Sequence, residues 1–211
     1  MSDGATNPEI GRILRASIMG FAVGSRVGQL SVPAFGGLVK AQPIDQGEAI
    51  YGLIYNMNID DDPLVRRLVL AEYPPEAVIN DQRQNRLLPI EMSVLAIGYL
   101  REGEIYHALP PRPPLNLDPV HLVRDLDELR NFSDNLAYLR LILRAAGGNV
   151  PVDQLLVAHV TDVYRLRSYD DPEGAAAWAQ TAVIELIELL RANYEMRIPT
   201  LEALSQALPV P

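Results

Sequence analysis

The chain has 211 residues, of which 48% are hydrophobic and 21% charged, and its formal net charge is −9. This composition is ordinary for a folded globular protein and excludes an intrinsically disordered chain. The sequence contains no cysteine, which excludes disulfides, thiolate nucleophiles and Cys-based metal sites. Because nucleic-acid binding requires a positive surface that displaces counterions, the acidic balance argues against a direct nucleic-acid partner.

Two further features concern the location of the protein and its contacts. No apolar run approaches the roughly 20 residues of a membrane-spanning helix, and the opening residues MSDGATNPEI lack the basic and apolar regions of a signal peptide. We therefore expect a cytoplasmic protein without a membrane partner. Arginine outnumbers lysine 17 to 1, since Lys40 is the only lysine. Arginine suits bidentate contacts at protein interfaces, but a GC-rich coding bias explains the excess equally well.

The first half of the chain has the pattern of short strands separated by turns. Six apolar runs at nearly regular spacing predict a closed sheet rather than βαβ units. Interior glycines at 20, 52 and 98 suit the tight bends of a small barrel. We therefore predict a small β-barrel domain over residues 8–110, with strands at 11–23, 35–42, 48–59, 64–73, 90–100 and 103–109.

A proline-rich segment follows the predicted barrel. The stretch LPPRPPLNLD, residues 109–118, holds four prolines in ten positions. Consecutive prolines favour an extended, semi-rigid backbone, so we interpret residues 111–119 as a linker that holds two domains apart. An alternative is that PPRPP is a ligand for modules with an aromatic groove. The linker is favoured because the hydrophobic period changes at this point.

The second half of the chain has a helical period. In residues 125–148, apolar side chains recur three and four residues apart, and Asp125 or Asp127 is placed to cap the start. We predict one helix there, further helices over 151–167 and 173–195, and a short final piece with Thr200 as its N-cap. Residues 120–208 thus form a predicted helical bundle. The predicted fold class is α+β with two domains, an N-terminal small closed β-barrel followed by a C-terminal all-α bundle.

The sequence contains no complete catalytic motif. The string GGLVKA has the wrong spacing for a phosphate-binding loop, and Ala41 stands where a hydroxyl is needed. His107, His121 and His159 lie in different predicted elements, and His159 fits a core or interface position better than a catalytic one. The acidic turn at 60–63, DDDP, fits a solvated turn better than a metal site. We expect neither an enzyme nor a bound cofactor or metal.

The most unusual segment is INDQRQNRLLPIE, residues 79–91, whose residues 80–86 are all polar. Its amides and guanidinium groups could donate to carboxylates or carbonyls of a partner. A solvated loop between strands is the simpler interpretation. The candidate partner-binding residues are Asp81, Gln82, Arg83, Asn85 and Arg86.

Three strings in the first half carry a family resemblance: GRILRASIMGFAV, PAFGGLVKA and AIYGLIYNM. With them, the stretch from Gly11 to about Pro114 resembles the HAS-barrel, the small β-barrel of HerA-type DNA-translocating ATPases and of ATP synthase subunits. DQRQNRLLPIEMSVLAIGY and ALPPRPPL are similar to uncharacterised bacterial proteins of this kind. In HerA-type proteins a RecA-like motor follows the barrel, whereas here helices follow and no Walker A motif exists. The resemblance therefore implies an assembly role, and no catalytic residue transfers.

Two functions remain open at this stage. The first is a non-enzymatic assembly protein, the barrel-bearing companion of a HerA-like ATPase and a NurA-like nuclease. The alternative is a barrel that binds single-stranded nucleic acid by stacking bases on aromatic rings, for which six rings are available: Phe21, Phe35, Tyr51, Tyr55, Tyr99 and Tyr106. The apolar circumference of the helix at 173–194 favours a homo-oligomer.

Overall fold

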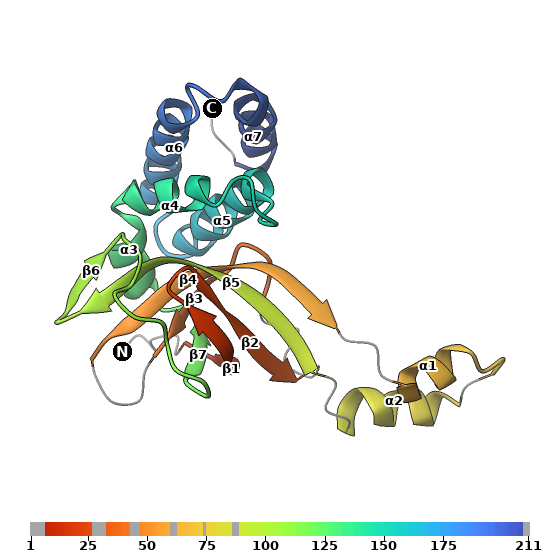
Figure 1. Ribbon diagram of the computed structural model, residues 1–211. Coiled ribbons are helices and arrows are strands. Elements are labelled where there is room, and N and C mark those ends of the chain that lie inside the picture. Colours follow the sequence, from red (N-terminus) through yellow and green to blue (C-terminus); the bar gives the residue numbers. More distant parts are fainter. Residues whose placement is uncertain are drawn as a thin grey trace.

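The computed structural model describes residues 7–26, 33–42, 47–59, 63–73, 75–85 and 89–208. Six strands form a closed barrel, and helices from the second half of the chain cover one side of it (Figure 1). This confirms the α+β class and the closed barrel in the N-terminal half. The barrel strands are β1 (Glu9–Ser17), β2 (Gly20–Arg26), β3 (Leu38–Ala41), β4 (Ala49–Ile59), β5 (Pro89–Arg101) and β7 (Pro119–Leu122).

All strand pairs of the barrel are antiparallel. The order is β2-β1-β7-β3-β4-β5, and a further pairing of β2 with β5 closes the ring. Strand β6 (Glu104–Tyr106) only extends the β5 hairpin. At the closure, a Cβ atom at Gly20 would lie 2.1 Å from the carbonyl oxygen of Val94. Glycine is therefore required where β2 meets β5.

The barrel interior follows from the alternation of side chains along each strand. Apolar residues from all six strands fill it, most of them branched, which is the usual content of a barrel this narrow. Its members include Ile10, Ile13, Phe21, Val23, Val39, Ile50, Ile54, Ile90, Met92, Val94, Val120 and Leu122.

The outer face of three strands is also buried, because the helices pack on it. Leu38, Tyr51, Leu53, Leu95 and Ile97 belong to the same apolar cluster as the helical residues. This explains why the first six residues of β4 are all buried rather than alternating. Because barrel and helices share a core, a division into two domains remains a prediction.

The proline-rich segment does not separate the barrel from the helices. It leads from β6 to β7, and β7 pairs with β1 on one side and with β3 on the other. The barrel therefore continues to Leu122, beyond the predicted boundary at residue 110, and residues 111–118 of the predicted linker connect two strands of one sheet. The change of hydrophobic period was a misleading guide here because β7 has only four residues.

The second half contains more helices than the sequence predicts. The predicted helix over 125–148 is three pieces, because Asp134 ends the first and the Asn135 side chain accepts from the amide of Ala137. Of the two predicted candidates, Asp125 is the N-cap, and its side chain accepts from the amide of Glu128. The helices are α3 (Leu126–Ser133), the 3-10 helix η2 (Leu136–Tyr138), α4 (Leu139–Arg144), α5 (Val152–Arg167), α6 (Pro172–Leu189) and α7 (Tyr194–Ala207).

The last helix starts earlier than predicted. Its N-cap is Asn193, whose side chain accepts from the amide of Met196. Thr200, predicted as the N-cap of a short piece, is buried in the middle of α7. The sequence suggested a later start because Pro199 lies inside the helix, where proline normally removes a hydrogen bond.

A pair of helices stands where the sequence predicts a strand. Residues 64–73 do not form a strand: α1 (Pro63–Val69) and α2 (Glu76–Asn85) connect β4 to β5. The apolar residues of LVRRLVL stand at positions 64, 65, 68, 69 and 70, a spacing that does not decide between a short strand and a helix. Pro63 at the first helical position favours the helix. We name α1, α2 and their connection, residues 63–85, the helical arm.

A single carboxylate joins the helices to the barrel. Glu128, in the first turn of α3, accepts from Asn7 Nδ2 at 2.7 Å, Lys40 Nζ at 3.0 Å and the Tyr51 hydroxyl at 2.7 Å. Burial, together with the hydrogen bond to Glu128, raises the pKa of Tyr51. We name these four residues the Glu128 junction. The only lysine therefore has a structural ion pair.

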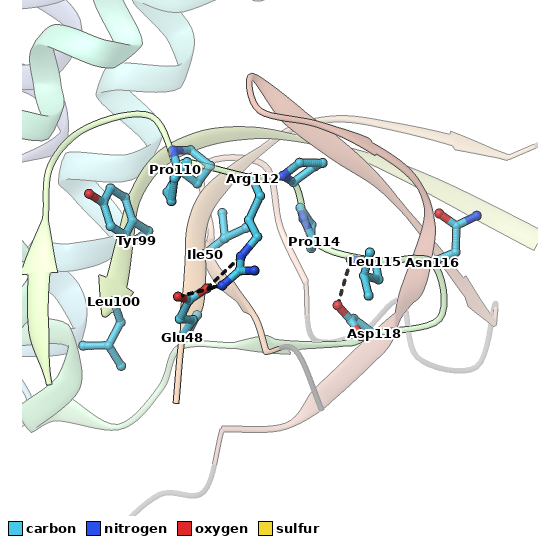
Figure 2. A pocket seen from close by; sticks show the side chains of 13 residues that line it. Glu48, Ile50, Tyr99, Leu100, Pro110, Arg112, Pro114, Leu115, Asn116 and Asp118 are labelled. Carbon is cyan, nitrogen blue, oxygen red and sulfur yellow. Dashed lines mark hydrogen bonds and ion pairs between the residues drawn. The ribbon is translucent and has the colours of Figure 1, made fainter. Parts of the chain in front are cut away.

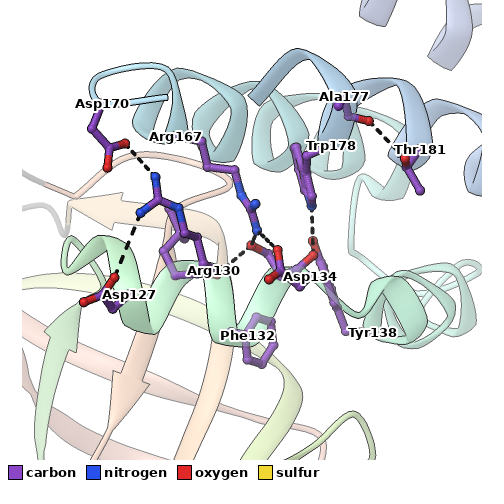
Figure 3. A network of polar contacts seen from close by, with 12 residues as sticks. Asp127, Arg130, Phe132, Asp134, Tyr138, Arg167, Asp170, Ala177, Trp178 and Thr181 are labelled. Atoms are coloured by element: carbon purple, nitrogen blue, oxygen red, sulfur yellow. Dashed lines mark hydrogen bonds and ion pairs between the residues drawn. The ribbon is translucent and has the colours of Figure 1, made fainter. Parts of the chain in front are cut away.

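A second polar network joins the helices to one another (Figure 3). Arg167 of α5 donates to Ser133 Oγ at 2.7 Å and to Asp134 at 2.6 Å, at the end of α3. Its guanidinium also lies over the ring of Trp178 in α6, 4.9 Å from the centroid, and the indole donates to the Ser133 carbonyl. Nearby, Arg130 bridges α3 to Asp170 at 2.6 Å.

A close contact between barrel and helices occurs at His159 of α5. One ring nitrogen of His159 lies 3.2 Å from the Gly36 carbonyl and the other 3.1 Å from the Tyr138 hydroxyl. Burial lowers the pKa of His159 to about 4. At Gly36, whose φ is +82°, a Cβ atom would lie 2.7 Å from the Ala158 Cβ. His159 is thus the core histidine that the sequence predicts.

We predict that Glu128→Ala lowers the free energy of unfolding by about 2–4 kcal/mol, because it leaves Lys40 and the Tyr51 hydroxyl buried without their acceptor. Chemical denaturation would measure the loss. Glu185→Ala is the matched control, since Glu185 pairs with Arg140 at 3.4 Å on the surface, and its removal should cost at most about 1 kcal/mol. Equal losses would contradict a special role for the Glu128 junction.

We predict that stability falls as the pH is lowered from about 6.5 to 5. His159 has an ordinary pKa of 6.5 when unfolded and about 4 when folded, so the unfolded chain binds more protons in this range. The loss approaches roughly 1.4 kcal/mol per pH unit. Denaturation at several pH values should show this slope, and His159→Gln should flatten it. Burial also lowers the pKa of His107, so the His159→Gln variant should keep a smaller loss of stability with falling pH. An unchanged slope in the variant would contradict the assignment.

We predict that Gly36→Ala costs more stability than Gly103→Ala. Both glycines have a positive φ, +82° and +85°, but a Cβ at Gly103 meets no atom within 4 Å. Gly103→Ala should therefore cost only the backbone strain, about 1 kcal/mol. Gly36→Ala adds an overlap with α5 and should cost about 2–4 kcal/mol in all. Thermal and chemical denaturation of both variants tests the difference, and similar losses would refute the close contact.

Candidate functional site

The helical arm projects away from the barrel (Figure 1). It connects the end of β4 at Ile59 to the start of β5 at Pro89. These strands are neighbours in the barrel, so a short turn would suffice to join them. The arm is therefore an insertion that the barrel does not need for its closure, and this indicates a role other than stability.

Large apolar side chains are exposed on the arm. Val69 is 75% exposed, Leu70 78% and Tyr73 87%, and all three lie at or just after the end of α1. Single exposed apolar residues are normal on protein surfaces. Three within five residues at the tip of a projecting element are typical of a protein interaction site. The arm is therefore our candidate functional site.

The predicted partner-binding residues fall on the arm, although not in a loop. Asp81, Gln82, Arg83 and Asn85 belong to α2, so the prediction of a polar loop between strands is wrong for them. Asp81 is exposed, and Asp81 and Asn85 lie one helical turn apart. The side chains of residues 82–85 and the whole of Arg86 lie outside the described residues. The sequence misled here because a helix without an apolar stripe has no periodic signal.

The residues that sequence reasoning missed are Val69, Leu70 and Tyr73. The sequence places them in a predicted strand, where alternate side chains would be buried. A signal was present in the proline and preceding acids at 60–63, which are typical of a helix start. The acids themselves, residues 60–62, lie outside the described part of the chain, so their expected solvated turn is untested.

Two of the three histidines come together, although not in a catalytic arrangement. The rings of His107 and His159 both contact Tyr138, and their centroids lie 5.5 Å and 5.4 Å from the Tyr138 centroid. Burial lowers the pKa of both, so each is neutral near pH 7. His121 lies apart in β7. Within the described residues, no group of three or more His, Asp or Glu side chains could hold a metal ion.

The aromatic side chains proposed for nucleic-acid stacking are mostly occupied in packing. Phe21 is 5% exposed and Tyr51 only 1%, so neither offers a ring face to a base. Tyr99 and Tyr106 stack on each other, with centroids 5.0 Å apart. These contacts weaken the alternative of a single-strand-binding barrel.

The chain matches no protein-family model and no curated protein at a significant level. The resemblance to the HAS-barrel therefore stays a prediction. None of the described helices is long and apolar enough to cross a membrane.

Proposed function

We propose that this chain is a non-enzymatic assembly protein that binds a protein partner through its helical arm. The observation that carries the proposal is the exposure of Val69, Leu70 and Tyr73 on an element that the barrel does not require. Burial of each such side chain in an interface is worth about 1.5–3 kcal/mol. Three of them are enough for the core of a specific contact.

The construction of the arm supports the same proposal. Its helices have seven and ten residues, and isolated helices shorter than about 12 residues are marginal in water. A partner that covers the apolar side chains supplies the burial that stabilises such short helices.

The resemblance to the HAS-barrel suggests which partner to test first. Such barrels accompany DNA-translocating ATPases, and this chain has no Walker A motif of its own. A HerA-like ATPase, or the NurA-like nuclease that acts with one, is therefore the proposed partner. The net charge of −9 favours a protein surface over direct contact with a polyanion.

We predict that Leu70→Ser/Tyr73→Ser weakens binding to a purified HerA-like ATPase of the same organism at least about tenfold, because the double variant removes two apolar anchors. Isothermal titration calorimetry or bio-layer interferometry would measure the affinity. The matched control is Tyr169→Ser/Tyr194→Ser, since these side chains are also exposed, at 74% and 67%, but lie in the helical half of the chain, away from the arm.

Three results would count against the proposal. The first is that neither the ATPase nor the nuclease binds the wild type. The second is that the arm variant and the control variant bind equally well. The third is tight, salt-dependent binding of single-stranded DNA, which would favour the alternative function. Sedimentation of the wild type tests the expected homo-oligomer separately.

A further inference from the structure

The proline-rich segment lines a cavity at the start of β4 and the end of β5 (Figure 2). The segment passes across the start of β4 and the end of β5, and the cavity between them has a volume of about 410 Å³. This lies within the usual size range of small-molecule sites. Residues 48–50, 99–100, 110–116 and 118 line it.

Most of the cavity wall is apolar and stiff. Ile50 and Leu100 come from the strands, together with the ring of Tyr99, and four prolines come from the segment. Pro110 and Pro114, the first and last residues of the PPRPP run, are buried. Because proline fixes its own backbone, this wall is formed before any ligand arrives, and binding orders little additional chain.

An ion pair fastens the middle of the segment to the barrel. Arg112 Nη2 donates to both carboxylate oxygens of Glu48 at 3.0 Å, and Arg112 Nε donates at 3.2 Å. Arg101 adds a weaker contact to Glu48 at 3.7 Å. The charge of Glu48 is therefore compensated within the chain, and so is that of Arg112.

The second carboxylate of the cavity has no such partner. Asp118 is only 4% exposed, and its Oδ2 accepts a hydrogen bond from the amide of Leu115 at 2.8 Å. Among the described residues Asp118 forms no ion pair, and its Oδ1 has no hydrogen-bond donor. A buried carboxylate without a cation is costly. The cavity thus has an excess negative charge.

The backbone beside Asp118 is strained. Leu117 has a φ of +71°, although it is not glycine and its side chain is exposed. Hydrogen bonds to β1 hold this conformation: the amide of Leu117 donates to the Ile13 carbonyl at 2.9 Å, and Arg12 donates to the Leu117 carbonyl at 3.1 Å. Strain of this kind persists where a fixed geometry serves a site. Here it fixes the position of the Asp118 carboxylate in the cavity.

We propose that this cavity binds an organic cation, an ammonium or guanidinium group on an apolar stem, with Asp118 as the counter-ion. The stem lies against the prolines, Ile50 and Leu100, and the cationic group donates to Oδ1 of Asp118. An anion does not suit the cavity, because its single guanidinium is already held by Glu48. The cation comes either from a free amine or from a basic side chain of a peptide.

This site is separate from the helical arm. Strand β4 begins beside the cavity at Ala49 and ends at the arm after Ile59. An 11-residue strand spans roughly 30 Å. The cavity and the arm can therefore be tested independently, and failure of one proposal leaves the other standing.

The test is a comparison of three probes of the same shape by calorimetry: 2-phenylethylamine, the neutral 2-phenylethanol and the anionic 3-phenylpropanoate. We expect the amine to bind and the other two to bind at least about tenfold more weakly. Asp118→Asn should lower the affinity for the amine by a similar factor, because the amide keeps the shape but loses the charge. Asp127→Asn, on the exposed first turn of α3, is the matched control and should bind like the wild type.

Amide chemical shifts of the wild type locate the site without any variant. Addition of 2-phenylethylamine should shift residues 48–50, 99–100 and 115–118 and leave the arm unchanged. A capped Leu-Lys-Leu peptide distinguishes the sources: tighter binding than the amine assigns the site to a peptide, and weaker binding assigns it to a free amine. Equal affinity for the three probes, equal affinity of Asp118→Asn, shifts elsewhere or no binding at all would each overturn the proposal.

Discussion

The position of the helices on the barrel depends on the carboxylate of Glu128. It accepts from Asn7 ahead of β1, from Lys40 on β3 and from Tyr51 on β4, so three barrel segments converge on the first turn of α3. Three donors to one partly buried carboxylate fix its position more strictly than apolar contact can, because hydrogen bonds are directional. With α3 in place, Phe132 packs on Tyr51 and the shared core can form on the outer face of the sheet.

Much of this fold could be predicted from local patterns. Four of the six predicted strands lie on barrel strands, although the first of them, 11–23, is in fact the hairpin of β1 and β2, and the helical period of residues 151–167 predicted α5 almost to the residue. In both cases one face of the element is buried, and the spacing of apolar residues in the sequence shows which face it is. The Asp125 cap was also readable, because a side chain and an amide three residues apart decide it locally.

The errors have physical causes that lie outside local sequence. Strand β7 has four residues, and only its long-range pairing with β1 and β3 makes it a strand. The arm was predicted as a strand and a loop because a segment without a buried face has no periodic pattern of apolar residues. In the candidate site, the sequence pointed to α2 through its polar side chains, whereas the exposure of the apolar groups at and after the end of α1 became visible only in three dimensions. Similarly, the pairing of Arg112 with Glu48 depends on where the proline-rich segment crosses β4.

The late position of β7 in the chain has a consequence for synthesis and folding. Strand β1 is made first, yet its partner β7 emerges roughly a hundred residues later. Until then β1 and β3 each present a row of unpaired amides and carbonyls, which are templates for pairing with other chains. Contacts between such distant segments also form slowly. A fragment that ends before Pro119 therefore has five of the six barrel strands in an open sheet prone to aggregation, and the smallest unit that can close the barrel includes Leu122.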